Sequence, residues 1–194
     1  MPGPLSTLKV LDFSTLLPGP YATMMLADMG AEVLRVEAPD RVDLAKVMPP
    51  FDGKFSTTFS YLSRGKQTLQ LNLKQPESVE KIKELVKDYD IVVEQFRPGV
   101  MDRLGVGYET LKAINPKLIY CAITGYGQTG PYKDRAGHDI NYIALSGALW
   151  YAGEPGALPM APPGLVGDIG GGALYLAVGL LAAILSARES GKGQ

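Results

Sequence analysis

The sequence has very little cysteine, histidine or net charge, and each shortage excludes a class of function. Its 194 residues include one cysteine and one histidine, which excludes an internal disulfide, a zinc finger and any metal site built on paired histidines. Nineteen basic against twenty acidic residues leave a net charge of −1, so composition favours neither nucleic acid nor an anionic membrane as partner. With Cys121 unpaired and no signal segment at the start, we expect a reducing, cytoplasmic compartment.

Glycine and proline are plentiful by comparison, with 23 and 15 residues. Both counts exceed average usage, which predicts many tight turns and places where the backbone approaches a neighbour closely. Hydrophobic residues make up 46% of the chain and charged residues 20%, both within the globular range. The length therefore predicts one domain with its own core.

Short apolar runs alternate with helical patterns along the first two thirds of the chain. Strands are expected at residues 9–13, 32–37, 68–73, 91–94 and 118–123, and helices at 20–29, 77–88 and 108–114, with another short helix between Gly99 and Gly105. Residues 40–63 show no sustained period and predict an irregular surface excursion that can contact a ligand. This order predicts an α/β fold, a Rossmann-like, doubly wound and mainly parallel sheet with flanking helices.

The last third has a different character and ends in a long apolar helix. One helix is expected over 139–152 and a loop over 153–163, and residues 169–187 carry no charge. That run is long enough to span a membrane. However, glycines 170–172 occupy its start, and no aromatic or basic belt brackets both ends. The pattern favours a buried central helix, with the membrane span as the alternative.

The segment from Gly125 to Gly130 has the form GxGxxG and follows a predicted strand. A dinucleotide site needs a helix start directly after these glycines, because the helix N-terminus holds the pyrophosphate. Pro131 follows instead, in a stretch without apolar period that includes Gly137. We therefore interpret the motif as a glycine-rich turn near a pocket, and a nicotinamide site is the alternative.

Two single residues have the chemistry of a reaction centre. His138 is the only imidazole, and although a lone histidine is more often structural, its pKa near neutrality suits acid–base work. Asp168 stands between Gly167 and glycines 170–172 at the start of the apolar helix. It is interpreted either as a helix N-cap or as a carboxylate stripped of neighbours so that another molecule can come close.

Three basic residues, Lys74, Arg97 and Arg103, follow the carboxyl ends of predicted parallel strands. Open α/β sheets bind ligands at this edge, so the placement suits a phosphate-bearing cofactor. The sequence contains no GxSxG elbow and thus does not favour a serine-centred triad.

Several segments together resemble the family III coenzyme A transferases of the CaiB/BaiF type. The matching segments cover nearly the whole chain and are LKVLDFSTLLPGPYATMMLADMGAEVLRVE, LQLNLKQPE, VVEQFRPGVMDRLGVGYETLKAINPKLIYCAITGYGQTGPY, AGHDINYIALSG and LVGDIGGGALYLAVGLLAAILSARESGKGQ. This family includes formyl-CoA transferase, carnitine CoA-transferase and α-methylacyl-CoA racemase. The string GHDINY makes the resemblance closest to the racemase branch, because the transferases usually carry another residue where this chain has His138.

The resemblance implies two chemical roles for Asp168. In the transferases the corresponding carboxylate attacks an acyl-CoA thioester and passes through a mixed anhydride to an aspartyl-CoA thioester. In the racemases it works with the histidine, here His138, on opposite faces of the α-carbon, so that one group removes the α-proton and the other returns one. Backbone N–H groups at the helix start after Asp168 are expected to stabilise the enolate oxygen.

The resemblance also implies how CoA is bound, with no metal and no NAD. The implied CoA contacts are Leu71, Asn72, Leu73, Lys74, Gln95, Phe96, Arg97, Arg103, Gly137, His138, Asp139, Ile140, Asn141 and Tyr142. Family members often have an arginine directly after the acidic residue that ends the second strand, whereas Ala38 follows Glu37 here. Arg41 is expected to supply that phosphate contact instead.

Family members run to about twice this length. The resemblance therefore implies that residues 1–194 are the N-terminal, CoA-binding portion of the large domain, with the small C-terminal domain absent from this chain, and that the full-length form is an interlocked homodimer. The leading hypothesis is a 2-methylacyl-CoA racemase. The alternatives are a CoA transferase that uses an aspartyl-CoA intermediate, and a truncated, inactive CoA-binding module.

Overall fold

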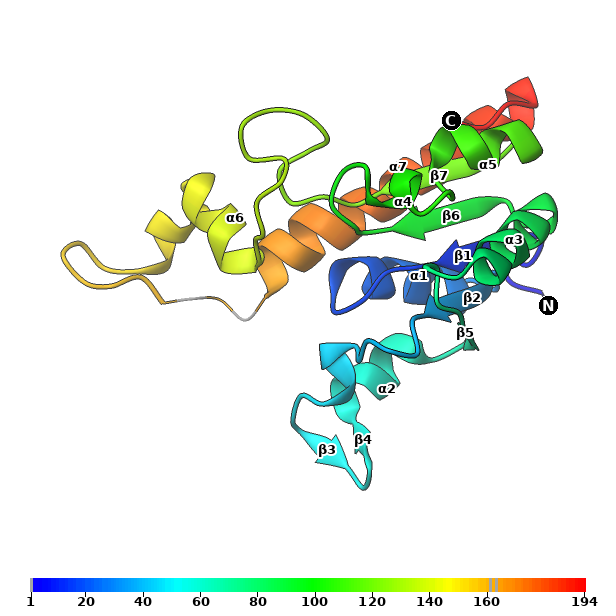
Figure 1. The fold of residues 1–194 in the computed structure, drawn as a ribbon. Helices are drawn as coiled ribbons and strands as arrows, with labels where there is room; N and C mark the ends of the chain where they lie inside the picture. Colours follow the sequence, from blue (N-terminus) through cyan, green and yellow to red (C-terminus); the bar gives the residue numbers. More distant parts are fainter. Residues whose placement is uncertain (1, 161, 163) are drawn as a thin grey trace.

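A five-stranded parallel sheet forms the centre of the computed structural model, which describes residues 2–160, 162 and 164–194 (Figure 1). The strands are β1 (Lys9–Asp12), β2 (Glu32–Glu37), β5 (Lys66–Gln70), β6 (Ile91–Glu94) and β7 (Ile119–Ala122), in the spatial order β5-β2-β1-β6-β7. The predicted α/β, doubly wound class is confirmed. β5 lies two residues earlier than expected, because it begins directly after a glycine turn at Gly65, where φ is +72°.

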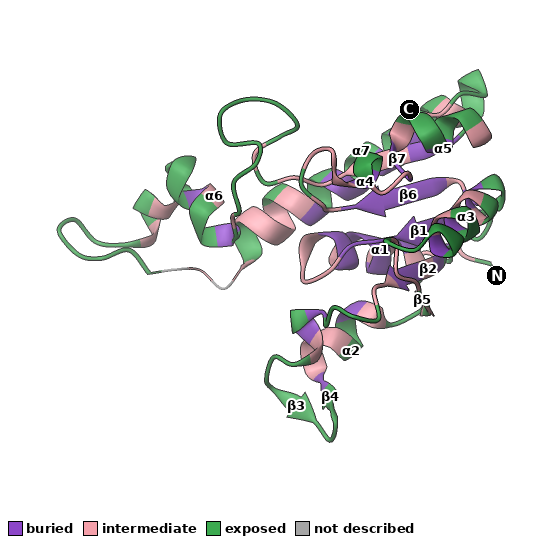
Figure 2. Cartoon of the chain, viewed as in Figure 1, coloured by how far each residue is buried: buried purple, intermediate pink, exposed green. Residues whose placement is uncertain are grey.

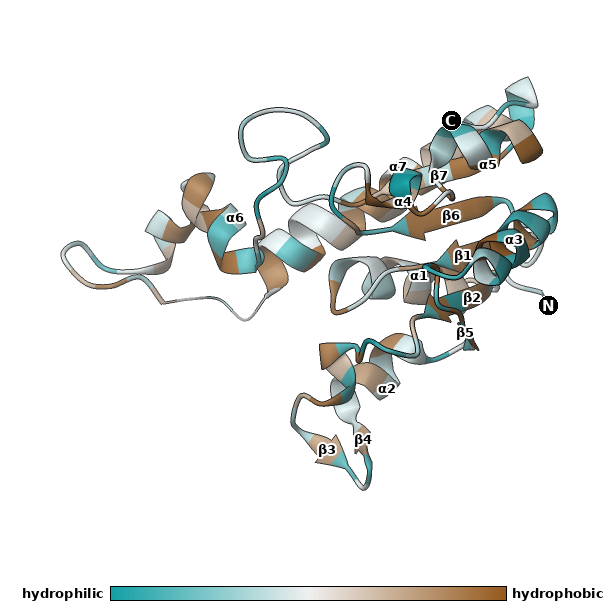
Figure 3. Cartoon of the chain, viewed as in Figure 1, coloured by the Kyte–Doolittle hydropathy of each residue, from teal (hydrophilic) through white to brown (hydrophobic). Residues whose placement is uncertain are grey.

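Helices cover both faces of this sheet, as the buried strands of a parallel sheet require. Helices α1 (Pro18–Asp28) and α7 (Leu174–Ser190) pack on one face, and α3 (Pro76–Leu85), α4 (Val100–Arg103) and α5 (Tyr108–Ile114) pack on the other. Neighbouring residues of β1 divide between the two cores, with Val10 in the first and Leu11 in the second. Figures 2 and 3 show the result: β1 and β6 are buried and hydrophobic, whereas the outer surface of α3 is exposed and hydrophilic.

The order of the strands defines a topological switch point between β1 and β6. From β1 the chain winds outward through β2 to β5, then crosses to the other side of β1 to form β6 and β7. At such a point the loops after the two central strands diverge, and open α/β sheets bind ligands there. The relevant loops are residues 13–17 after β1 and residues 95–99 after β6.

The segment after β2 was expected to be irregular, and this prediction is wrong in part. It forms a 3₁₀ turn η1 (Leu44–Lys46), a small hairpin of β3 (Phe51–Asp52) and β4 (Phe55–Ser56), and helix α2 (Thr57–Ser63). Ser56 caps α2 by accepting a hydrogen bond from the Phe59 N–H at 3.4 Å. The helix is short and buries only Leu62 fully, so it has little apolar periodicity for a sequence to reveal.

Residues 139–160 form an arm that projects beyond the carboxyl end of the sheet (Figure 1). The single helix expected over 139–152 is instead divided into α6 (Asp139–Leu145) and the 3₁₀ turn η3 (Ala148–Ala152). Gly147 separates them, because its φ of +83° cannot continue a right-handed helix. Most of this arm is exposed (Figure 2).

The apolar C-terminal segment is helical but is not buried all round, so the prediction of a buried central helix is only half right. A π-helix, η4 (Leu165–Ala173), leads directly into α7. Leu176, Leu180 and Ile184 pack on the sheet, whereas Tyr175 is 76% exposed. Leu165–Ser190 is the one helix in the described part of the chain with the length and hydropathy to cross a membrane, a test that core helices also pass.

Candidate functional site

Asp168 lies inside η4, at the carboxyl end of the sheet. The helix begins at Leu165, and its N-cap is Gly164, whose φ is +64°. Asp168 is therefore not the N-cap, and the N–H groups that follow it lie within the helix rather than at its start. This corrects the expectation that a free helix start after Asp168 supplies donors to an enolate. Its side chain is half-buried, which leaves the carboxyl accessible to a ligand.

Asp139 connects the arm to the backbone that carries Asp168. Its Oδ2 accepts hydrogen bonds from the N–H groups of Gly167 at 2.6 Å and Asp168 at 2.8 Å. A side chain at Gly167 would place its Cβ 3.1 Å from this oxygen, so the absence of a side chain eases the close approach. The glycine flank of Asp168 is thus used by the protein's own packing, and the other Asp139 oxygen, Oδ1, is buried without a partner.

The surroundings of Asp168 favour its protonated form. Burial raises the pKa of its carboxyl, and the neighbouring Asp139 charge raises it further, whereas His138 lowers it. Asp139, the residue that follows His138, hydrogen-bonds the Asp168 N–H, so the histidine and the carboxyl lie on adjoining segments. A carboxyl with a perturbed pKa is typical of functional sites.

His138 is exposed at the N-cap of α6, just before Asp139. Its backbone N–H donates to Asn141 Oδ1 at 2.9 Å, which closes the first turn of the helix. The outward-facing Ile140 is 46% exposed. Sequence analysis predicted His138 and Asp168 as a pair, and the hydrogen bond from the Asp168 N–H to Asp139, the residue after His138, joins the two segments that carry them.

Tyr142 fills the space next to the glycine-rich turn. A Cβ at Gly125 would lie 2.3 Å from Tyr142 Oη, and one at Gly137 would lie 2.6 Å from Tyr142 Cε1. Tyr126 packs edge-on against the same ring, with 5.3 Å between centroids. Two of these glycines therefore make room for a tyrosine. No helix follows Gly130 directly, since α6 starts only at Asp139, so the helix start that a dinucleotide motif requires is missing here.

The predicted CoA contacts after β6 lie at the switch point. Gln95 Nε2 donates to Thr15 Oγ1 at 3.1 Å, and Gln95 Oε1 is buried without a partner. The Phe96 side chain packs into the core under α3 and α5, while Arg97 is exposed. Arg103, at the end of α4, is exposed as well. The cationic groups of this region are thus free to meet a phosphate.

The predicted contacts after β5 are found at the other edge of the sheet. Leu71 and Leu73 pack against the second core, so their side chains stabilise the fold. The carboxamide oxygen of Asn72 accepts the Lys74 N–H at 3.0 Å, and Lys74 Nζ lies 3.6 Å from Asp40 Oδ2. That ion pair joins this turn to the one after β2, where Arg41 is exposed.

The β1–α1 loop physically links these groups. A Cβ at Gly164, the N-cap of η4, would lie 3.4 Å from Leu17 Cδ2, and Gln95 Nε2 donates to Thr15 Oγ1 at 3.1 Å. The loop therefore touches both the helix that carries Asp168 and the segment that begins with Gln95. The structure shows no direct contact between the turn of Lys74 and the Asp168 group among the described residues.

Glu94 is a buried acid that sequence analysis missed. Its Oε2 accepts the Phe96 N–H at 2.6 Å, and Tyr120 Oη donates to Oε1 at 3.4 Å. Burial raises the pKa of Glu94 to about 7. It borders a cavity of about 260 Å³ together with Asp102, Tyr108 and Tyr120. The available signal was an acidic residue that closes an otherwise wholly apolar strand.

Comparison with known proteins identifies the family. The family model described as CoA-transferase family III matches residues 5–194. The chain is 42% identical over 191 residues to human alpha-methylacyl-CoA racemase, covering 98% of this chain and 46% of that protein. It is 41% identical to human succinyl-CoA:glutarate CoA-transferase, covering 98% of this chain and 43% of that protein.

Comparison with solved structures indicates the same family. A crystal structure of a CAIB/BAIF family protein from Brucella suis superposes with a TM-score of 0.93 at 36% identity, covering all of this chain and 52% of that one. The chain thus spans about half the length of the relatives it matches. The chain belongs to CoA-transferase family III.

Proposed function

We propose that the protein acts on acyl-CoA thioesters as a 2-methylacyl-CoA racemase, with Asp168 and His138 as the proton-transfer pair. One observation carries the proposal: Asp139, which directly follows the chain's only histidine, accepts the backbone N–H of the half-buried Asp168 at 2.8 Å and so joins the segments of the two residues. The racemase reaction needs two groups of this kind, because the proton that leaves one face of the α-carbon must be replaced from the other. The similarity to human alpha-methylacyl-CoA racemase supports this branch.

In this proposal each group changes its protonation state once per turnover. His138 in its neutral form removes the α-proton, and protonated Asp168 delivers a proton to the opposite face; the reverse direction uses ionised Asp168 as the base. The raised pKa of Asp168 suits this exchange, because a carboxyl that holds its proton more tightly can act as the acid in one direction and as the base in the other. Asp139 holds the Asp168 backbone in place during both directions.

A second candidate is CoA transfer, in which the Asp168 carboxylate attacks the thioester carbonyl and the CoA thiolate leaves. The CoA thiolate then attacks the Asp168 carbonyl of the resulting anhydride, which releases the donor carboxylate and leaves CoA on Asp168 as a thioester. An acceptor carboxylate takes up the CoA by the reverse of these two steps and frees Asp168. The similarity to a succinyl-CoA:glutarate CoA-transferase favours this alternative. A third candidate is a CoA-binding module without turnover, which needs only the exposed cationic side chains at the carboxyl edge of the sheet.

The CoA moiety is proposed to lie along the carboxyl edge of the sheet. Exposed Lys74, Arg97, Arg103 and Arg41 surround this edge and suit its phosphates. The described residues contain no group of three or more metal-ligating side chains, and the proposed chemistry uses none.

We also propose that the functional form is a homodimer in the cytoplasm. The arm exposes Trp150 at 78%, Tyr151 at 89% and Leu158 at 95%. Exposed aromatic and aliphatic side chains that lie close together are typical of surfaces covered by a partner.

The test is incubation with a 2-methylacyl-CoA in deuterium oxide, with the α-hydrogen followed by NMR and CoA transfer to added carboxylic acids followed by chromatography. The racemase proposal predicts deuterium at the α-position with no net change of acyl group. CoA transfer without label at that position would contradict it and support the transferase. Binding of CoA with neither reaction would support the module without turnover.

A further inference from the structure

The β1–α1 loop holds a leucine in a backbone conformation that leucine rarely adopts. Leu16 has a φ of +61° and is the one non-glycine residue with positive φ among residues 2–160, 162 and 164–194. A side chain at this φ is strained, so surrounding contacts must hold the conformation. The loop stands at the switch point, between the strand that ends at Asp12 and the helix that starts at Pro18.

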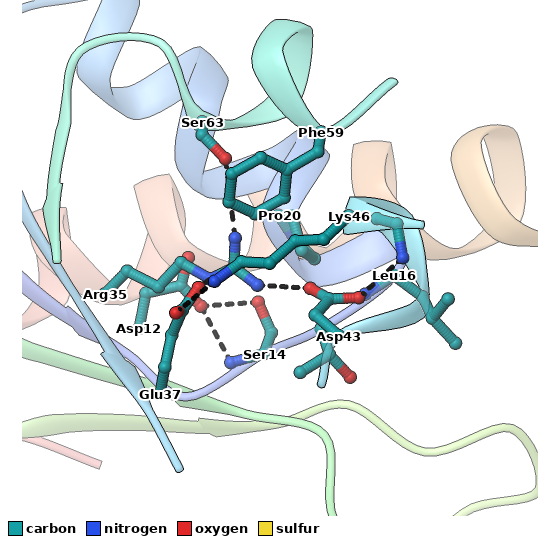
Figure 4. Close-up of polar contacts among 12 residues, drawn as sticks. Asp12, Ser14, Leu16, Pro20, Arg35, Glu37, Asp43, Lys46, Phe59 and Ser63 are labelled. Atoms are coloured by element: carbon teal, nitrogen blue, oxygen red, sulfur yellow. Dashed lines mark hydrogen bonds and ion pairs between the residues drawn. The ribbon is translucent and has the colours of Figure 1, made fainter. Parts of the chain in front are cut away.

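Asp43 supplies the contact that holds Leu16. Its Oδ1 accepts the Leu16 N–H at 3.2 Å and the Ala45 N–H at 3.0 Å, so one oxygen ties the loop to the turn η1. Its Oδ2 pairs with the guanidinium of Arg35 (Figure 4). Both side chains are almost completely buried, at 2% exposure for Arg35 and 4% for Asp43.

Arg35 is itself fixed from several sides. Its Nε lies 3.3 Å from Glu37 Oε1, its NH1 donates to Ser63 Oγ at 3.4 Å, and its guanidinium lies 5.0 Å from the centre of the Phe59 ring. Lys46 pairs with the second oxygen of Glu37 at 2.5 Å. A buried charge with this many partners has one position, and therefore gives Asp43 one position as well.

The other end of the loop rests on the two segments that form the proposed site. Leu17 Cδ2 would be 3.4 Å from a Cβ at Gly164, the N-cap of η4, and Pro18 lies against Gly172 in the same helix. Thr15 accepts the hydrogen bond of Gln95 at 3.1 Å. A change in the loop's conformation would therefore move η4, and with it Asp168.

We propose that Arg35 and Asp43 are positioning residues for the reaction: their buried ion pair holds Leu16 in the left-handed conformation, and the loop so formed sets the position of η4 and Asp168. The inference rests on the proposed function of Asp168, but the contacts themselves do not involve a ligand. Neither residue is among the side chains proposed to contact substrate or CoA, and their link to Asp168 runs through the loop.

The experiment uses Asp43→Asn, which keeps the size and an acceptor oxygen but removes the charge that pairs with Arg35. Leu16→Gly is the rescuing change, because glycine adopts positive φ without help. Asp28→Asn is the matched control, since it removes the same charge from the exposed Asp28–Arg64 pair. If Asp43→Asn alone does not fold, the same change is measured in the Leu16→Gly background.

Two readouts are followed in each variant: deuterium exchange of backbone amides in residues 13–18 and 164–173, and kcat and KM with acyl-CoA. For Asp43→Asn we expect exchange to rise about tenfold in both segments. We expect kcat to fall about tenfold with KM within about twofold of wild type. Adding Leu16→Gly restores both readouts toward wild type, and Asp28→Asn leaves both unchanged.

The inference is overturned by faster exchange confined to residues 13–18, or by a double variant no better than Asp43→Asn. An active wild type whose kcat does not change in Asp43→Asn also overturns it and leaves the proposed function intact. A wild type without acyl-CoA turnover, in which exchange nevertheless rises in both segments, contradicts the proposed function and retains the positioning of η4.

Discussion

The two members of the proposed catalytic pair are held in very different ways. Asp168 belongs to the body of the molecule, because η4 packs against the β1–α1 loop and continues into α7 on the face of the sheet. His138 stands at the base of an exposed arm, and its backbone hydrogen bonds reach only Asn141 and Tyr142, within the first turn of α6. Asp139 is the joint between the two regions. The sheet therefore positions the Asp168 carboxyl, whereas the position of the His138 imidazole depends on the arm.

The largest effect is expected from Asp168→Asn, which removes the reactive group from the rigid side of the pair. Both α-proton exchange and CoA transfer should fall at least about 10³-fold, because each route requires this carboxyl. The fold should be retained, and circular dichroism checks that it is. Activity within about tenfold of wild type would show that the reactive carboxyl lies elsewhere.

His138→Gln tests whether the side chain at the base of the arm transfers a proton. We expect α-proton exchange to fall about 10²-fold, since an amide cannot take up a proton, while CoA transfer falls much less. The measurement compares the two rates in one preparation. An equal loss in both rates would mean that His138 shapes the site without transferring a proton.

Asp139→Asn tests the hydrogen bonds that connect the arm to the Gly167 and Asp168 backbone. We expect a loss of about tenfold in the maximal rate, because a neutral amide holds the Gly167 and Asp168 N–H groups less strongly than a carboxylate. The Asp139 charge raises the pKa of Asp168, so its removal lowers that pKa. In the direction that uses ionised Asp168 as the base, the acid limb of the rate–pH profile should therefore move to lower pH. A limb that stays in place or moves upward would show that the two carboxyls do not interact.

The smallest effect on function is expected from Glu94, where the prediction concerns the free energy of unfolding. Its pKa of about 7 in the folded protein lies above the ordinary 4.5, so the folded state binds the proton more tightly than the unfolded state. The free energy of unfolding should therefore decrease as pH rises from about 4.5 to about 7, by roughly 3 kcal/mol, and stay lower above that range. Glu94→Gln keeps an acceptor for the Phe96 N–H and should lack this decrease, as measured by urea unfolding at pH 5 and pH 8. A parallel decrease in wild type and variant would assign it to other groups.

The sequence predicted the elements with strong local signals. The bounds of β2, β6 and α5 follow directly from apolar runs with clear stops on either side. The break in the helix at Gly147 was missed, because an isolated glycine is also compatible with a continuous helix. The membership of the CoA-transferase family was predicted from motifs and is confirmed.

The contacts that hold the candidate site in place were harder to predict from the sequence. His138 and Asp168 could be singled out as the only imidazole and a carboxylate among glycines. The roles of Asp139, Arg35 and Asp43 depend on contacts between residues far apart in the chain, such as the 2.8 Å bond between Asp139 and the Asp168 N–H. No periodicity or spacing reports such contacts.

Every proposed activity requires an acyl-CoA site at the carboxyl edge of the sheet. A calorimetric titration of the protein with CoA tests directly whether this site exists. We predict saturable binding at one site per chain. Binding should weaken about tenfold in Arg97→Gln, which lies at the switch point, and stay unchanged in Lys81→Gln on the exposed face of α3. No saturable binding, or equal binding in both variants, would contradict the account.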